Sequence, residues 1–408
     1  MKIIKSCCIY LLMLLVILQC NTLMVYFIVN KYYLIAIFGM IVVLFMLGRK
    51  FNIDRNKIYI ALLYLFCMGI LFVFSDFRDI EFLFTIVATF VLFLLFLDSE
   101  ECVAKVFEAF TNIMFVIASF SIFFFVFASL LNWIQPTGYY SNKVIEWGSL
   151  NYTSYYHLYY ECQTIEAFGY KGMRNTAIFL EAPMFVYPLA IAIYYELFLR
   201  KDGYRKIVAG VFCAAMLTTF STTGLLALVA ILYLRFYADF KGTNFFKFVV
   251  TPCLIVVAAM GAVYIFYDKT VNGAHSVGLR GDDIIASLKC FLDHPILGVG
   301  FEKLEVLNEY CTIKRAQPSS STGMGAVFAF GGLLLGLWYA IPLFVSIYKY
   351  IFNPQKRADL GIVILSSALF CVTIVETRVL CTVMNALSWL IIIGSVNFPD
   401  KAEDNKEF

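Results

Sequence analysis

The chain has 408 residues, of which 62% are hydrophobic and only 14% are charged, against about 45–50% and about 25% in ordinary soluble domains. This composition excludes a soluble globular protein, because water could not solvate so much apolar surface. The formal net charge of +3 gives no indication of nucleic-acid binding. The twelve cysteines include no Cys-x-x-Cys pair, which excludes a disulfide framework or a zinc site.

Apolar segments near the length needed to cross a bilayer recur along the whole chain. A helix needs about 20 apolar residues to cross roughly 30 Å of hydrocarbon, where a lone segment can satisfy its backbone polar groups in no other way. The first segment follows Lys2 and Lys5 and has no cleavage pattern, so we interpret it as a retained helix. We predict an all-α polytopic membrane protein of about twelve transmembrane helices, with residues 1–408 forming one membrane domain. The expected helices cover 9–29, 32–48, 58–74, 80–97, 106–131, 177–199, 207–220, 222–236, 248–266, 324–348, 360–376 and 379–396.

The apolar stretch from Ile207 to Leu234 could be one long span or two short ones. Lys and Arg flank it on both sides, which indicates that both of its ends are cytoplasmic. The chain must then turn within the stretch, and Ser221-Thr222-Thr223-Gly224 is the polar point that can turn. We therefore predict two helices, with both chain termini on the cytoplasmic side of the plasma membrane. A single span would lower the expected count to about eleven.

Two long connections, 132–176 and 267–323, are predicted to lie on the external face. The first is rich in tyrosine, most densely from Asn151 to Tyr160. Tyrosine has a flat apolar face and a hydroxyl, which suits sugar rings, and Tyr155 and Tyr156 are our candidate substrate contacts. An aromatic belt at the membrane interface explains the same residues equally well.

The first long loop enters the sixth expected helix through Arg174-Asn-Thr-Ala-Ile-Phe-Leu-Glu181-Ala-Pro183. An ionisable residue at membrane depth is costly, so Glu181, about one turn inside, is a candidate functional residue. Arg174 is its expected partner or neighbour. A purely structural ion pair at the helix mouth is the alternative. Pro183 also allows a break in this helix.

The second long loop contains an expected amphipathic helix that lies in the membrane interface. It begins near Gly281 and Asp282 and stops at Pro295. Its apolar face consists of Ile284, Ile285, Leu288, Phe291 and Leu292.

A helix start beside Arg280 could hold a phosphate, because free N–H groups and a guanidinium both favour an anion. Asp282 and Asp283 either cap the helix or supply a base near the phosphate. The alternatives are a plain surface charge for Arg280 and a packing or capping role for His294.

These segments, in this order, resemble the family of bacterial O-antigen and capsular polysaccharide polymerases (Wzy), relatives of the O-antigen ligases. The motifs span roughly residues 170 to 340, and the helix count and the two external loops match over the whole chain. The resemblance rests on Arg174-Asn-x3-Phe-x-Glu-Ala-Pro-Met-Phe, on Leu217-Thr-Thr-Phe-Ser-Thr-Thr-Gly224, on Arg280 followed by Phe-x-Asp-His-Pro-Ile-Leu-Gly-Val-Gly-Phe301, and on Gly331-Gly-Leu-Leu-Leu-Gly336.

The resemblance implies a glycosyltransferase, independent of metals and other cofactors, that joins polyprenyl-diphosphate-linked oligosaccharides at the outer face of the membrane. Besides these donor and acceptor lipids, it implies membrane lipid, a chain-length regulator and a flippase as partners. External arginines would engage the diphosphate, a role that falls on Arg174 and Arg280. The candidate bases are Glu181, Asp282 and Asp283. The candidate substrate contacts are Tyr155, Tyr156, Ser221, Thr222 and His294.

Two departures bear on the choice between polymerase and ligase. Ligase-like members usually carry an Arg where this chain has Ser221-Thr222-Thr223, and a His where it has Ser319-Ser-Ser-Thr322. Their absence favours a polymerase and leaves the base unassigned. A flippase for the same lipid-linked sugars is the alternative from another class. It would predict inverted repeats and charges near the bilayer midplane, and the sequence has no such repeat.

Overall fold

Apolar helices make up most of the described chain. The computed structural model describes residues 2–27, 30–47, 54–79, 82–141, 151–167, 170–239, 274–313, 320–372 and 378–398. Within these ranges, five helices are long and apolar enough to cross a membrane. They are α4 (Arg55–Phe74), α7 (Glu100–Phe124) with its π-helical end η2 (Phe125–Leu130), α8 (Ala182–Tyr194) with η3 (Tyr195–Leu199), α10 (Thr222–Asp239) and α14 (Gly323–Phe352).

Shorter helices occupy the other expected segments, except that 248–266 lies outside the described residues. They are α1 (Lys2–Leu18), α3 (Asn30–Met46), η1 (Leu83–Ala88) continued by α6 (Thr89–Phe96), α9 (Lys206–Thr218), α15 (Arg357–Val372) and α16 (Arg378–Ile392). A single turn, α2 (Met24–Phe27), follows α1. The mostly helical fold is confirmed and is compatible with a membrane protein, whereas the number of spans stays a prediction.

The expected break in the apolar stretch 207–234 is present. Helix α9 ends at Thr218, Phe220 adopts a left-handed conformation with φ of 47°, and α10 begins at Thr222. The Ser221 hydroxyl accepts a hydrogen bond from the Gly224 N–H at 3.4 Å, so it caps the start of α10. One polar turn therefore divides this stretch into two helices that pack on each other.

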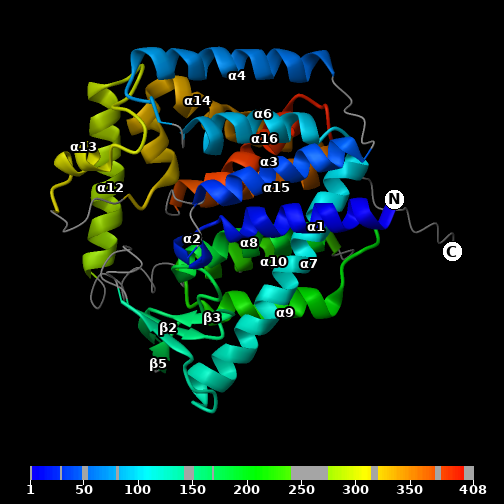
Figure 1. The fold of residues 1–408 in the computed structure, drawn as a ribbon, viewed down its shortest axis with the longest axis vertical. Helices are drawn as coiled ribbons and strands as arrows, with labels where there is room; N and C mark the ends of the chain where they lie inside the picture. The colour runs from blue at the N-terminus through cyan, green and yellow to red at the C-terminus, as the bar shows by residue number, and fades with distance from the viewer. Residues whose placement is uncertain are drawn as a thin grey trace, which may run out of the picture.

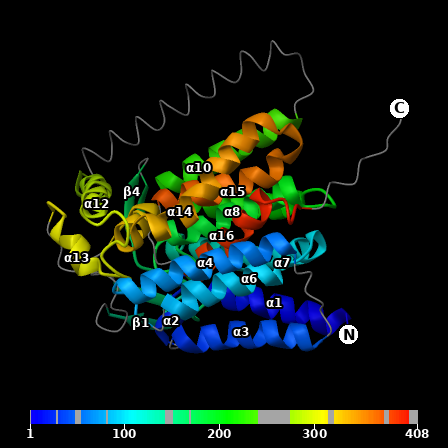
Figure 2. The same ribbon diagram turned by 90° about the horizontal axis from the view of Figure 1, so that it is seen from above.

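The long helices run side by side, and the loop structures gather at one end of them. Figure 1 shows α1, α4 and α6 running in one direction, while α12 (Ala274–Asp293) lies across their left-hand end. Figure 2 shows α12 end on at this same end, together with α13 (Leu304–Glu309) and the strands. Helix α1 begins at the opposite end in both views. An orientation across the bundle is what an interfacial helix requires.

The described part of the first long loop contains five short strands, which the all-α prediction did not include. Strands β1 (Gly138–Tyr140), β2 (Tyr152–Tyr155) and β3 (Tyr159–Glu161) form an antiparallel sheet, and β4 (Thr164–Ala167) pairs with β5 (Tyr170–Met173). The turn between β2 and β3 has Tyr156 and His157 in the left-handed region, with φ of 55° and 57°. Asn and Gly usually indicate such a turn, and neither occurs at these two positions, so no local pattern predicted a hairpin here.

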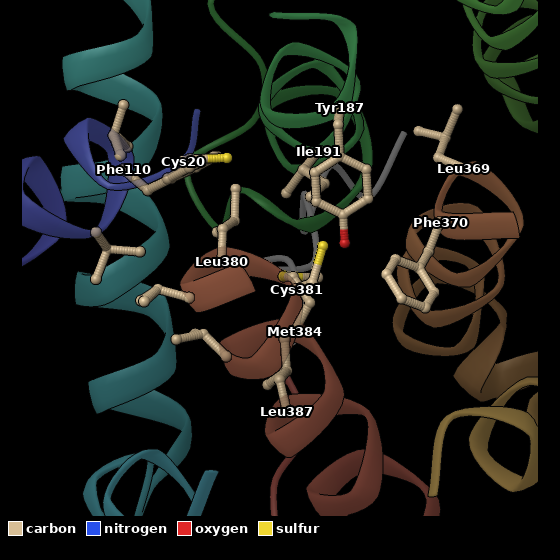
Figure 3. Close-up of a cluster of buried hydrophobic side chains, with 14 of the residues drawn as sticks. Cys20, Phe110, Tyr187, Ile191, Leu369, Phe370, Leu380, Cys381, Met384 and Leu387 are labelled. Atoms are coloured by element: carbon tan, nitrogen blue, oxygen red, sulfur yellow. The ribbon is translucent and has the colours of Figure 1, made fainter. Parts of the chain in front are cut away.

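Helix α8 is the central element of the core. Each of its residues from Ala182 to Tyr194 is buried. Figure 3 shows Tyr187 and Ile191 of α8 directed toward Cys381 and Met384 of α16, with Phe370 of α15 beside them. A helix enclosed by protein on all sides is held rigidly, and its first residue follows directly after Glu181.

Candidate functional site

The segment from Arg174 to Glu181 passes through one end of the core as irregular chain, with a turn at Ala177, whose φ is 50°. Asn175 to Leu180 are all buried. The Leu23 N–H donates to the Ile178 carbonyl at 3.0 Å, and the Tyr160 N–H donates to the Ala177 carbonyl at 2.9 Å. Neighbouring chain on both sides therefore fixes this segment, with Arg174 at one end and Glu181 at the other.

Arg174 is anchored to the turn between α9 and α10. Its Nε donates to the carbonyl oxygen of Thr219 at 2.9 Å, and its backbone N–H donates to the carbonyl of Gln163 at 2.9 Å. The adjacent Asn175 N–H donates to the Thr218 carbonyl at 3.0 Å. The turn that carries Ser221 and Thr222 is thus brought to Arg174, as a shared site requires.

Arg280 lies close enough to Arg174 to affect the pKa of its guanidinium, although the two belong to different loops. Burial lowers the pKa of Arg174, the negative charge of Glu181 opposes that effect, and the positive charge of Arg280 lowers the pKa further. Within the described ranges, neither arginine comes within ion-pair distance of a carboxylate. Two neighbouring guanidinium groups of this kind favour a bound anion, and their donors match phosphate oxygens in pairs.

Glu181 and Cys162 complete the surroundings of Arg174. Glu181 is half-buried at the N-terminal end of α8. The Cys162 thiol donates to the Leu180 carbonyl at 3.2 Å. Burial, aided by the charge of Glu181, raises the pKa of Cys162 to about 12. This cysteine is therefore a neutral thiol at physiological pH and is poorly suited to act as a nucleophile.

Asp282 and Asp283 lie inside α12, because the helix starts at Ala274. The predicted start near Gly281, and with it a capping role for these aspartates, is wrong. Both side chains are buried. The Asp282 carboxylate accepts hydrogen bonds from the N–H and the hydroxyl of Thr312, at 2.9 and 2.6 Å, and from the Ile313 N–H at 2.9 Å. Asp283 accepts from the N–H and hydroxyl of Ser321. Both aspartates therefore tie the chain after α13 to α12.

Most of the predicted apolar face of α12 points away from the protein, except Phe291, which is half-buried and packs on Phe328. Ile284, Ile285, Leu288 and Leu292 are between 52% and 64% exposed, whereas Ser287 and Cys290 on the opposite face are buried. The predicted stop before Pro295 is confirmed, since α12 ends at Asp293. An apolar face turned outward suits contact with lipid rather than with water.

The two candidate tyrosines occupy different environments. Tyr155 is buried, and its hydroxyl donates to a carboxylate oxygen of Glu161 at 3.0 Å. Tyr156 is 61% exposed and keeps a ring that a ligand could contact. Glu161 itself is a buried carboxylate that the sequence reasoning missed, and Ser129 at the end of α7 also donates to it. Glu161 is two residues after Tyr159 in β3, so both side chains lie on the same face of the strand, and this spacing could have indicated that Glu161 is buried.

His294 is not brought to the arginines. It is exposed just beyond α12, roughly 20 Å along the helix from Arg280 at 1.5 Å per residue. Its backbone N–H donates to the Cys290 carbonyl, and its carbonyl accepts from the Gly298 N–H, both at 3.0 Å. The backbone of His294 therefore helps to end α12.

Among the residues that the structure describes, no group of three or more His, Cys, Asp or Glu side chains is arranged to hold a metal ion. The site thus consists of two arginines, a carboxylate and a polar turn at one end of an apolar bundle. No protein-family model matches the chain, and no curated protein is significantly similar to it in sequence.

Proposed function

We propose that the chain is a polysaccharide polymerase that joins polyprenyl-diphosphate-linked oligosaccharide repeat units at the outer face of the plasma membrane. The observation that carries the proposal is that Arg174 and Arg280, from two separate loops, are near enough for the charge of Arg280 to lower the pKa of Arg174, while neither has a carboxylate at ion-pair distance among the described residues. The order of motifs that resembles the polymerase family supports it independently.

The two arginines fit the leaving group of this reaction. The bond between the anomeric carbon of the donor and its diphosphate oxygen breaks, and the anomeric carbon forms a new bond to an acceptor hydroxyl. The departing diphosphate takes up negative charge, which permanently charged guanidinium groups stabilise. The partly buried setting of Arg174 strengthens this attraction, because screening by water is weaker there.

Glu181 is our proposed base for the acceptor hydroxyl. It lies near enough to Arg174 to oppose the lowering of that residue's pKa, and it is half-buried beside the proposed diphosphate site. Asp282 and Asp283 are engaged with the backbone and hydroxyls of Thr312 and Ser321, which favours an anchoring role for them. In the proposed step, the acceptor proton passes to the Glu181 carboxylate as the glycosidic bond forms.

The location suits a substrate whose lipid stays in the membrane. Helix α12, which carries Arg280, lies across one end of the apolar helices (Figure 1) and turns an apolar face outward. A polyprenyl chain could remain among lipid tails while its diphosphate reaches the arginines at the interface. We propose that this end faces outward and that the end where α1 begins is cytoplasmic, as the basic residues suggest.

The test is to incubate the purified protein in liposomes with a lipid-linked repeat unit and to analyse the products by size. We expect lipid-linked glycans of two, three and more repeats. Transfer of the glycan to a different acceptor would indicate a ligase. Movement across the bilayer without a new covalent bond would indicate a flippase. Either result would refute the polymerase proposal.

A further inference from the structure

Helix α14 is interrupted inside the apolar bundle. Gly332 has φ of 56° and ψ of −149°, so the helix is broken there and divided into two parts. A break in a helix frees backbone N–H and carbonyl groups, and leaving them without partners in an apolar environment is costly. Some other part of the chain must therefore satisfy these groups.

The residues directly after α12 supply those partners. The segment Pro295–Phe301 forms backbone hydrogen bonds to both sides of the break, with lengths from 2.8 to 3.4 Å. The bonds run from the Val299 N–H to the Ala329 carbonyl, from Gly300 N–H to Phe330, from Leu333 N–H to Pro295, and from Leu334 N–H to Ile296. The two motifs Pro-Ile-Leu-Gly-Val-Gly and Gly-Gly-Leu-Leu-Leu-Gly are thus two halves of one structure.

Close backbone contact explains the glycines in both motifs. A Cβ atom on Gly298 would lie 2.1 Å from the Phe330 carbonyl oxygen, and one on Gly332 would lie 2.4 Å from the Ile296 carbonyl. Both glycines also have positive φ, of 65° and 56°. A side chain at either position would force the two backbones apart.

The opposite side of the Pro295–Phe301 segment is held by the loop after α4. The Ser75 hydroxyl donates to the Leu297 carbonyl at 3.3 Å, and the Phe301 N–H donates to the Asp76 carbonyl at 3.1 Å. The Lys303 ammonium lies 2.6 Å from the Asp76 carboxylate. The segment is therefore fixed between this loop and the break in α14.

Helix α12 leads directly into this segment and packs on the first part of α14. The rings of Phe291 and Phe328 contact each other edge to face at 5.3 Å between centroids. Cys290 is fully buried, with its Sγ 4.0 Å from the Ala329 carbonyl oxygen. The attachment of α12, which carries Arg280, thus depends on the same stretch of α14 that the segment closes.

We infer that the Pro295–Phe301 segment is a positioning element: by closing the break in α14 it fixes α12 and holds Arg280 next to Arg174. None of its residues needs to touch the substrate. The role in catalysis rests on the proposed function, whereas the role in docking α12 does not.

Cys290 provides a native reporter for the docking of α12. Burial, aided by the charge of Asp293, raises the pKa of its thiol to about 11. In the full-length protein in detergent, we expect Cys290 to resist a maleimide reagent, with Cys290→Ala used to assign the labelled site. Gly332→Ala should increase labelling of Cys290 and lower polymer formation, each by about tenfold or more.

Two glycines offer matched controls. Gly281→Ala changes a glycine of α12 whose added Cβ would meet open space. Gly203→Ala imposes the same kind of positive-φ strain, with φ of 79°, where an added Cβ has no neighbour within 4 Å. Both variants should keep Cys290 protected. A Gly332→Ala protein with Cys290 still protected, or with Cys290 exposed but normal polymer formation, would overturn the inference.

A milder variant keeps the test valid if Gly332→Ala fails to fold. Ser75→Ala removes one hydrogen bond to the segment and should lower polymer formation by about two- to tenfold. If the segment acts through Arg280, Ser75→Ala should cause little further loss in an Arg280→Ala protein. An equal loss in both backgrounds would contradict the inference. If the wild-type protein makes no polymer, the proposed function fails, while the labelling of Cys290 still decides whether the segment docks α12.

Discussion

The arginines at the two ends of helix α8 and its continuation η3 differ in their carboxylate partners. At its C-terminal end, Glu196 is fully buried and receives hydrogen bonds from the N–H, Nε and Nη2 of Arg205, the last at 2.8 Å. Arg200 lies 3.8 Å from the same carboxylate. At its N-terminal end, Arg174 and Arg280 approach each other with no carboxylate at ion-pair distance among the described residues.

This difference distinguishes arginines that stabilise the fold from arginines that are available to bind a ligand. The buried Glu196 carboxylate has its bonding capacity used within the protein, and the arginines that it binds also reach Asn112 and Glu108 of α7, so the cluster ties η3, α7 and the start of α9 together. Arg174 and Arg280 have no carboxylate at ion-pair distance among the described residues, and although the charge of Glu181 offsets part of their repulsion, they gain from an external anion.

Replacing either arginine of the candidate site should have the largest effect on activity. Arg174→Ala and Arg280→Ala should each lower polymer formation by about 10²- to 10³-fold, the usual loss when one transition-state electrostatic contact is removed. The rate is measured per folded molecule in liposomes. Arg78→Ala, at an exposed arginine in the loop after α4, is the matched control and should stay within a few fold of wild type. If polymer formation fell only in proportion to the amount of folded protein, these arginines would be structural, like those around Glu196.

Replacing the buried carboxylate at the other end should instead affect stability. Glu196→Gln removes the negative charge and one of the two acceptor oxygens that face Arg205 and Arg200, and it should cost about 3 kcal/mol, seen as a lower inactivation temperature in detergent. Activity per folded molecule should change little. Glu101→Ala, in an exposed pair with Lys105, should cost under about 0.5 kcal/mol. If Glu196→Gln abolished polymer formation in fully folded protein, the paired end would also have to be considered functional.

Asp282 should behave as an anchor and not as a base. Asp282→Asn weakens the hydrogen bonds from Thr312 and Ile313, so we expect a loss of about 1 to 3 kcal/mol in stability. Polymer formation should fall less than in the arginine variants, without a change in its pH profile. Asp293→Asn, at an exposed position of the same helix, is the control. Thr312→Val should reproduce part of the Asp282→Asn effect. A loss of 10²-fold or more with a shifted pH profile would instead favour Asp282 as the base.

The exposed tyrosine should give the smallest effect. If Tyr156 contacts a sugar ring, Tyr156→Ala should raise KM about three- to tenfold, which corresponds to about 0.5–1.5 kcal/mol, and leave kcat unchanged. Tyr156→Phe keeps the ring and should retain most of the affinity. Equal KM values in all three proteins would favour the interpretation of this tyrosine as part of an interfacial belt.

Much of the helical fold could be predicted because its signals are local. The apolar segments, the break at Ser221 and the stop of α12 before Pro295 each depend on a few adjacent residues. The strands of the first long loop could not be predicted, since Tyr156 and His157 adopt left-handed turn conformations that other residues usually signal. The predicted start of α12 was also wrong, because local residues pointed to the wrong position. Gly281 and Asp282 look like a helix start, whereas the helix continues through them.

The sequence alone determined that this is a mostly helical, apolar chain with arginines in two long loops, because composition and periodicity are local properties. Only the tertiary structure brought Arg280 to Arg174, buried Tyr155 and engaged Asp282 with Thr312. It also showed that Pro295–Phe301 closes the break in α14. Contacts between segments far apart in the chain depend on how helices pack. That packing is decided by shape and by the need to satisfy every buried polar group, which no single segment encodes.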